Sequence, residues 1–146
     1  MDRDELGAWL RLTLSPGVGN GTARSLLARF GLPQAIFAQP ESALRQCVTA
    51  AQARSLCAVP ENWEALLAAT WQWLGDAGAP ATARTIVTLG DDLYPRALLE
   101  TEDPPLLLYI LGAARLLAAN PFPTGRCLAV VGSRNPTAQG AENARL

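Results

Sequence analysis

Residues 126–140, near the C-terminal end of the chain, are its most informative stretch. Residues 128–131 form a short continuous apolar run, which is typical of a strand covered on both faces of a parallel sheet. Gly132 lets the backbone turn sharply, and Asn135 followed by Pro136 is a preferred pair of residue types at a helix start. The sequence therefore predicts a strand, a tight turn and a helix N-terminus.

This predicted turn has the chemistry of a phosphate site. A helix that begins just beyond a buried strand presents free backbone N–H groups and a positive dipole end. Arg134 adds a guanidinium whose paired donors suit phosphate oxygens. Many α/β proteins make the same turn with a glycine for structural reasons alone, so the residues leave that alternative open for Gly132, Ser133 and Arg134.

The first half of the chain has the apolar periodicity of short helices. Helices are predicted over 4–12, 23–30, 40–47, 49–57 and 61–77. Thr49 and Gln52 have the spacing of a capping box, and Gly31 is placed to end the second helix. The inward faces are predicted to carry Leu6, Trp9, Leu10 and Thr13 in the first helix, and Trp63, Leu66, Leu67, Trp71 and Leu74 in the last.

From Arg84 the pattern changes to strands. Residues 85–89, 104–110 and 128–131 are predicted strands, with a turn at 90–92 and short helices ending near 99 and 119. The boundary between the two patterns is expected near residues 78–80. The predicted fold class is α plus α/β: a SAM-like or helix-hairpin-helix-like helical domain over 1–78, then the beginning of a Rossmann-like parallel sheet over 79–146.

The second of these domains is expected to be incomplete. An open parallel sheet needs several strand–helix units to cover both faces, and the segment after Arg84 supplies only about two or three strands. The chain is therefore predicted to be truncated within its Rossmann-like domain. A compact single domain with a short last helix is the alternative.

Composition limits the chemistry of any site. All 12 basic residues are arginines, and the chain has no histidine. These absences exclude histidine-based triads, histidine-ligated metals and a P-loop lysine within these residues. The acidic residues at 91–92 and 100–103 lack the spacing of metal ligands and are interpreted as solvated loop charge. Neither a metal nor a cofactor is expected.

The overall make-up is that of a globular protein, with 49% hydrophobic and 17% charged residues. No apolar run approaches the roughly 18 residues that span a bilayer, and the charged N-terminus is unlike a signal peptide. A cytoplasmic protein with no membrane contact is expected. Cys47, Cys57 and Cys127 are widely spaced and are predicted to be reduced and buried.

Charge is distributed unevenly along the chain, although the net charge is only −1. Residues 1–60 carry six arginines against four acids, and residues 126–146 carry three arginines against one acid. Residues 61–125 carry eight acids against three arginines. Both candidate binding segments therefore lie in the mildly basic parts of the chain.

A second candidate contact is the glycine-rich turn at residues 14–23. Its order of helix, Pro-Gly-apolar-Gly and helix has the shape of a helix-hairpin-helix, in which Gly17 and Gly19 would bring backbone N–H groups to a DNA phosphate. Arg24 and Arg29 are the side chains best placed to assist. The alternative is a tight turn between two packed helices. A dinucleotide fingerprint is excluded, because its third glycine would fall on a threonine.

The tryptophans allow two interpretations. Trp63 and Trp71 lie eight residues apart on one helical face, with Trp73 nearly opposite Trp71, and exposed aromatic rings can stack on bases. Packing in the core and between domains is the favoured use of these large apolar rings.

An ordered set of residues resembles the DNA-processing protein A family (DprA, also called Smf). The set comprises Tyr94, Pro95, Leu98, the Asp-Pro-Pro-Leu run at 103–106, Leu108, Tyr109, Gly112, the Ala-Val-Val-Gly-Ser-Arg run at 129–134 and Gly140. The helical half, with its Pro-Gly-Val-Gly turn, is similar to that family's N-terminal helical domain. The resemblance is strongest from Arg84 onward.

The resemblance implies a single-stranded DNA-binding protein of DNA uptake and natural transformation, which protects incoming strands and assists loading of the RecA recombinase. No enzymatic activity is implied. By position, Gly132, Ser133 and Arg134 would contact DNA phosphates, and Asn135 and Thr137 would assist at the helix start. Gln139 stands where the family often has an aromatic residue. The family's second glycine-rich loop, its homodimer surface and its RecA-contacting surface would lie beyond residue 146.

One alternative function uses the same predicted turn. A Rossmann-class enzyme that cleaves nucleoside monophosphates, of the phosphoribohydrolase kind, would seat a nucleotide phosphate there. Such an enzyme needs a later glycine-rich loop and a catalytic glutamate, and neither is visible in this sequence. An inactive fragment is the other alternative, since an unfinished sheet would leave an unpaired edge and apolar faces.

Overall fold

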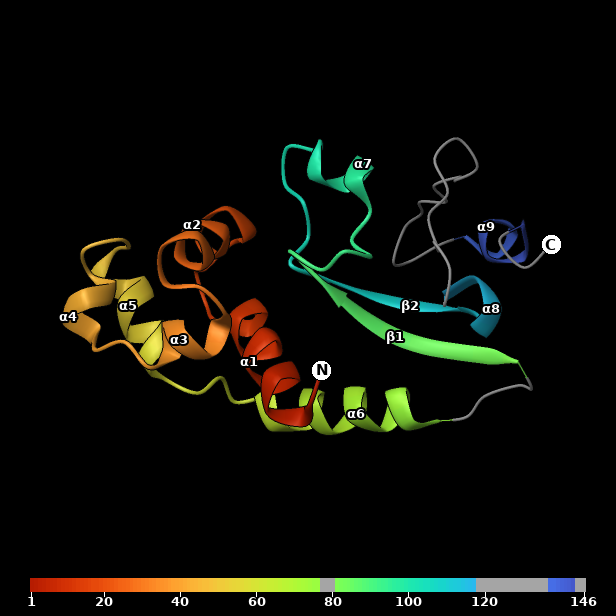
Figure 1. Ribbon diagram of the computed structural model, residues 1–146, viewed down its shortest axis with the longest axis horizontal. Coiled ribbons are helices and arrows are strands. Elements are labelled where there is room, and N and C mark those ends of the chain that lie inside the picture. Colours follow the sequence, from red (N-terminus) through yellow and green to blue (C-terminus); the bar gives the residue numbers. More distant parts are fainter. Residues whose placement is uncertain (77–80, 118–136, 144–146) are drawn as a thin grey trace.

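The computed structural model describes residues 1–76, 81–117 and 137–143. In these ranges a cluster of helices is followed by a two-stranded antiparallel sheet (Figure 1). The helix α6 runs beneath the sheet, and α7 lies on its other side. The described part of the chain therefore confirms a mixed helical and sheet protein.

The helices of the first half are short, and their ends are set by local chemistry. They are α1 (Arg3–Leu14), α2 (Asn20–Phe30), α3 (Pro33–Phe37), α4 (Glu41–Leu44), α5 (Ala50–Cys57) and α6 (Trp63–Gly75). The predicted capping box of Thr49 and Gln52 is present at the start of α5. Gly31 ends α2 with φ 87°, a conformation that favours glycine.

The helical core is built from α1 to α5. It buries Trp9, Leu12, Val18, Ala23, Leu26, Ile36, Leu44, Ala53 and Leu56. The predicted inward face of α1 is confirmed for Leu6, Trp9 and Leu10 but is wrong for Thr13, which is exposed while Leu12 is buried.

The faces of α6 and the cysteines also differ in part from the prediction. Trp71 is 41% exposed instead of buried, because α6 is apolar around much of its circumference and only one side meets the protein. Cys47 is half-buried, whereas Cys57 is exposed at the end of α5, so its predicted burial is wrong. Both thiols are free, and Cys127 lies outside the described residues.

The sheet consists of β1 (Thr82–Thr88) and β2 (Leu107–Ala113). The strands are antiparallel, with Thr85 opposite Ile110. The two strands predicted first in the Rossmann-like sheet therefore exist, but they do not pair in parallel with each other. A parallel sheet is not found among the described residues, and the predicted strand 128–131 lies outside them.

The connection between the strands is an ordered turn followed by α7 (Arg96–Leu99). Gly90 has φ 104°, and the Asp91 carboxylate accepts hydrogen bonds from the Thr88 backbone N–H (2.6 Å) and hydroxyl (2.9 Å). Asp91 is an exposed loop residue, as predicted, and its carboxylate also closes this turn. Beyond β2 lie α8 (Ala114–Leu117) and α9 (Ala138–Asn143).

The sheet packs on the helices through shared apolar clusters. Leu6 and Leu10 of α1, Leu67 of α6 and Ile86 of β1 form one buried cluster. The opposite face of the sheet buries Val87, Tyr94 and Ile110. The predicted domain boundary at 78–80 lies outside the described residues. No helix of the described ranges has the length and apolar character to cross a bilayer.

Candidate nucleic-acid interface

The predicted phosphate-binding turn falls largely outside the part of the chain that the structure describes. Gly132, Ser133, Arg134 and Asn135 all lie in the range 118–136. Thr137 is described: it is exposed and comes directly before the first residue of α9. Their assignment as phosphate contacts stays a prediction.

The predicted hairpin turn between α1 and α2 is an ordered feature. Gly17 has φ 75°, in the left-handed region that side chains other than glycine rarely adopt. The backbone N–H of Val18 donates to the Ser15 carbonyl at 3.1 Å, which closes the turn. The Gln52 side-chain amide donates to the Gly17 carbonyl at 2.9 Å, so the start of α5 holds the turn in place.

The start of α2 is open to a ligand. Gly19 is its N-terminal capping residue and provides no side-chain hydrogen bond to the first turn. A Cβ placed on Gly19 would meet no atom within 4 Å, so the backbone here is accessible. The first backbone N–H groups of a helix need partners from outside the helix, and the positive end of the helix dipole favours an anion as that partner.

A shallow, open pocket of about 590 Å³ lies beside this helix start. Its walls come from the first turns of α2 and from the α4–α5 connection. They are mostly polar and comprise Gly21, Thr22, Ser25, Arg45, Gln46, Cys47, Val48, Thr49 and Gln52. Hydroxyl, amide and guanidinium donors in one place suit phosphate oxygens.

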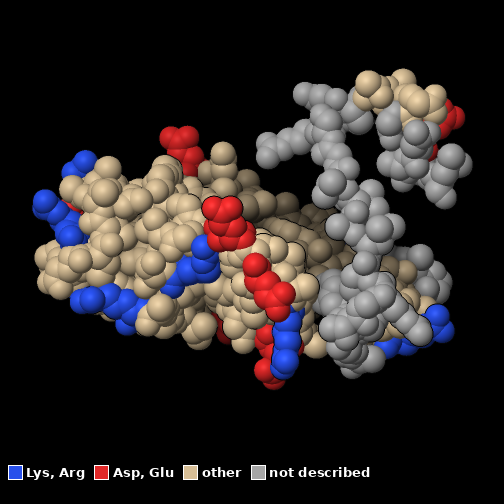
Figure 2. All heavy atoms as spheres, turned by 90° about the horizontal axis from the view of Figure 1, so that it is seen from above, with Lys and Arg blue, Asp and Glu red and all other residues tan. Residues whose placement is uncertain are grey.

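Arginines dominate the charge of this end of the molecule. Residues 13–60 contain four arginines, Arg24, Arg29, Arg45 and Arg54, and one acid, Glu41. The last three of these arginines are exposed. Figure 2 shows basic side chains spread over the end formed by α2, α4 and α5. Arg11 belongs to the core instead, because it donates to the Leu56 and Ala58 carbonyls and lies 4.0 Å from the centre of the Phe37 ring.

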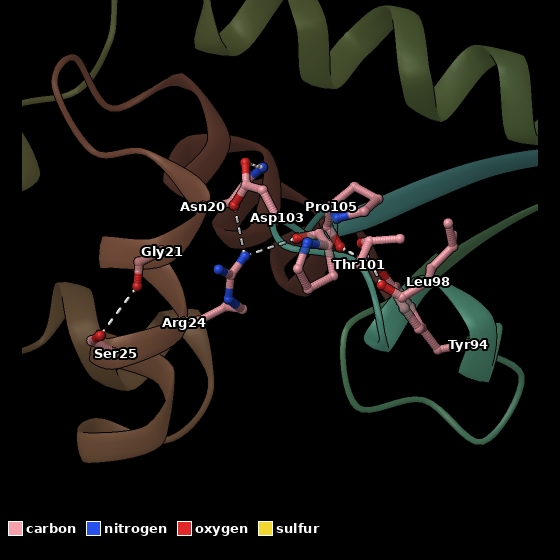
Figure 3. Close-up of polar contacts among 10 residues, drawn as sticks. Asn20, Gly21, Arg24, Ser25, Tyr94, Leu98, Thr101, Asp103 and Pro105 are labelled. Atoms are coloured by element: carbon pink, nitrogen blue, oxygen red, sulfur yellow. Dashed lines mark hydrogen bonds and ion pairs between the residues drawn. The ribbon is translucent and has the colours of Figure 1, made fainter. Parts of the chain in front are cut away.

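Arg24, which was predicted to assist at the hairpin, forms an ion pair with Asp103, an acid 79 residues later in the sequence. Its Nη1 donates to Asp103 Oδ1 at 2.9 Å and to the Pro104 carbonyl at 3.1 Å, while Asn20 Nδ2 donates to Asp103 Oδ2 at 2.9 Å (Figure 3). We call Asn20, Arg24 and Asp103 the clasp. The hydrogen bond from Arg24, then that from Asn20, lowers the pKa of Asp103. Asp103 is an exposed loop residue, as predicted, and its carboxylate also pairs with Arg24.

The residues that follow Asp103 dock the sheet onto the helices. Pro104 is buried, and Leu106 is 3% exposed within the helical core. The Tyr94 hydroxyl donates to the Pro105 carbonyl at 2.7 Å, and burial raises the pKa of Tyr94. We call residues 103–106 the docking segment. Nothing in the local sequence pattern signalled this role, because its partners lie about eighty residues earlier in the chain.

The tryptophans act mainly in packing, as predicted. Trp63 donates from Nε1 to the Gly7 carbonyl at 2.6 Å. Trp73 meets the ring of Tyr109 edge to face, with centroids 5.4 Å apart. Among the described residues, no group of three or more Cys, Asp or Glu side chains could hold a metal ion.

Comparison with known proteins supports the resemblance noted from the sequence. The sequence model of the family described as DNA recombination-mediator protein A matches residues 85–146. No curated protein and no solved structure was found to match the chain. The matched range contains β1 from Thr85 onward, the docking segment, β2 and the predicted phosphate turn. The match to the DNA recombination-mediator protein A family over residues 85–146 agrees with the resemblance to DprA.

Proposed function

We propose that this protein binds single-stranded DNA during recombination, holding the DNA backbone through Gly132, Ser133 and Arg134, with Asn135 and Thr137 at the following helix start. The observation that carries the proposal is the family match over residues 85–146, which relates this segment to DNA processing in recombination. The arginine and the glycine-rich turn supply the donors that phosphate oxygens need.

The hairpin turn offers a second contact surface. Gly17 and Gly19 expose the backbone at the start of α2, and the pocket beside it presents Arg45 with several hydroxyl and amide groups. Contacts of this kind hold the sugar–phosphate backbone without reading the base sequence. The basic end formed by α2, α4 and α5 would attract a polyanion to this surface.

The proposal extends to the rest of the predicted organisation. Residues 1–78 form a helical domain, and residues 79–146 begin a Rossmann-like domain in which the strand 128–131 would add parallel pairing. The binding is non-enzymatic. The biological setting is natural transformation, in which the protein protects incoming strands and helps to load RecA. Homodimer formation, which the family resemblance implies, belongs to the same proposal.

Substitution of Arg134 tests the proposed phosphate contact. Arg134→Ala should weaken binding to a labelled single-stranded oligonucleotide by roughly tenfold, because one charge-assisted hydrogen bond is lost. The loss should be similar for oligothymidylate and for mixed sequences, since phosphate contacts are independent of sequence. Fluorescence anisotropy at one salt concentration measures both affinities.

Arg96→Ala is the matched control. It removes the same charge from an exposed position on α7. Equal losses from Arg134→Ala and Arg96→Ala would contradict a specific contact at Arg134. A loss confined to certain sequences would replace the phosphate contact with a base-reading role.

A further inference from the structure

The clasp places an acidic side chain on Arg24, in the helix that begins directly after the hairpin turn. Both Asp103 oxygens accept hydrogen bonds at 2.9 Å, one from Arg24 and one from Asn20. The pair lies at the surface, with 28% of the Arg24 side chain and 60% of the Asp103 side chain exposed. Figure 3 shows the Arg24 side chain reaching from α2 toward the loop that carries Asp103.

The donors of the clasp are those that bind a phosphate. Guanidinium and amide N–H groups bind carboxylate and phosphate oxygens in the same geometry. Arg24 and Asn20 both lie in the first turns of α2, and Arg24 Nη2 is 3.7 Å from the position that a Cβ on Gly21 would take. The guanidinium therefore lies over the accessible start of α2, next to a residue that lines the polar pocket.

We infer that Asp103 is an intramolecular competitor for nucleic-acid phosphates at Arg24 and Asn20. The inference rests on the proposed function, since it assumes that DNA reaches the hairpin surface. A carboxylate and a phosphate cannot occupy the same donors together. The clasp therefore lowers the affinity of the hairpin surface until a phosphate displaces Asp103.

The geometry makes this displacement feasible. An exposed ion pair is weak and is screened by salt, whereas a DNA strand offers a series of phosphates at once. The bond from Arg24 to the Pro104 carbonyl does not depend on the charge of Asp103. That bond would keep Arg24 in place after the carboxylate leaves.

Asp103→Asn tests the inference with little disturbance of shape. The amide keeps an oxygen that can accept from Arg24, but it competes poorly with a phosphate because it is neutral. Glu102→Gln is the matched control: it makes the same charge change one residue away, at an exposed side chain that has no hydrogen bond or ion pair among the described residues. Circular dichroism checks that both variants stay folded.

Affinity for a labelled oligothymidylate is measured by fluorescence anisotropy for the wild type, D103N, E102Q and the double variant D103N/R24Q. We expect D103N to bind on the order of two- to fivefold tighter than E102Q, and the added R24Q substitution to remove that gain. Equal affinities of D103N and E102Q would overturn the inference and leave the proposed function standing. A gain that persists without Arg24 would also overturn it. Absence of binding by all four proteins would instead contradict the proposed function, and the inference would fail with it.

Discussion

The carboxylate of Asp103 links the loop before β2 to the helix α2. It accepts hydrogen bonds from two side chains of α2, and the residues directly after it enter the helical core. At the scale of single residues, the Asp-Pro-Pro-Leu run of the family resemblance is thus a docking element: Asp103 holds α2, and Leu106 fills the core.

The lowered pKa of Asp103 can be measured directly. Because Arg24 is the main cause, Arg24→Ala should raise the pKa of Asp103 toward the ordinary aspartate value of about 3.9. A carboxyl whose pKa is lowered by folding stabilises the protein above its unfolded pKa. That stabilisation is lost as the pH falls through the lowered value. Titration of the carboxyl carbon by NMR gives the pKa in each protein.

Arg29→Ala is the control for this titration. It removes the same charge from an exposed position near the end of α2, away from Asp103. An Asp103 pKa that is equally low with and without Arg24 would show that the clasp does not form in solution.

Tyr94 holds the docking segment at Pro105, two residues after the aspartate that binds α2. Its hydroxyl donates to the Pro105 carbonyl, and Tyr94→Phe should lower the free energy of unfolding by about 0.5–1.5 kcal/mol in a urea titration at neutral pH. Burial raises the pKa of Tyr94, so the stabilisation is complete below the ordinary value near 10 and is lost as the pH rises through the raised value. An unchanged free energy of unfolding in the variant would contradict this role.

At the scale of elements, the hairpin turn depends on the start of another helix. The Gln52 side chain both completes the capping box of α5 and donates to the Gly17 carbonyl. The turn, the start of α2 and the start of α5 therefore form one structural unit around the polar pocket.

Gly17→Ala should destabilise this unit. Its φ of 75° is costly for alanine, and the free energy of unfolding should fall by about 1 kcal/mol. Gly75→Ala is the matched control, because Gly75 is the last residue of α6 and a Cβ there meets no atom within 4 Å. It should be neutral or slightly stabilising, since alanine is a better helix former. Chemical denaturation compares the two, and equal effects would contradict the strain at Gly17.

Helix ends could be predicted from the sequence where they depend on residues that are close together in the chain. The capping box at Thr49 and the end of α2 at Gly31 were both predictable, because each depends on residues within one turn. The helix α3 was not predicted, since Pro33 can follow one helix or begin the next, and here it begins one. The antiparallel pairing of β1 and β2 was also missed, because short apolar runs do not reveal strand direction.

In the candidate site too, features that depend on neighbouring residues were predictable, whereas features that depend on distant contacts were not. The positive φ of Gly17 and the accessible backbone at Gly19 agree with the hairpin that the glycine pattern predicted. The clasp could not be predicted, because Arg24 and Asp103 are 79 residues apart and no periodicity links them. Of the predicted phosphate turn, the structure describes only Thr137, so its geometry remains a prediction from the sequence.

In the molecule as a whole, the helical half and the sheet share buried clusters, and exposed arginines are concentrated at one end. Leu6, Leu67 and Ile86 pack in one cluster across the two halves. Exposed arginines gather at the end formed by α2, α4 and α5, where Asp103 of the docking segment pairs with Arg24. This arrangement gives a nearly neutral protein a surface that can attract a polyanion locally.

The salt dependence of single-stranded DNA binding by this chain is the decisive measurement for the proposed phosphate contacts. Each phosphate neutralised should contribute about −0.7 to the slope of log K against log salt concentration, so about three contacts predict a slope near −2. Arg134→Ala should make that slope shallower by about 0.7. A binding constant that does not change with salt concentration, or no binding even at low salt, would contradict the claim that the protein holds single-stranded DNA by its phosphates.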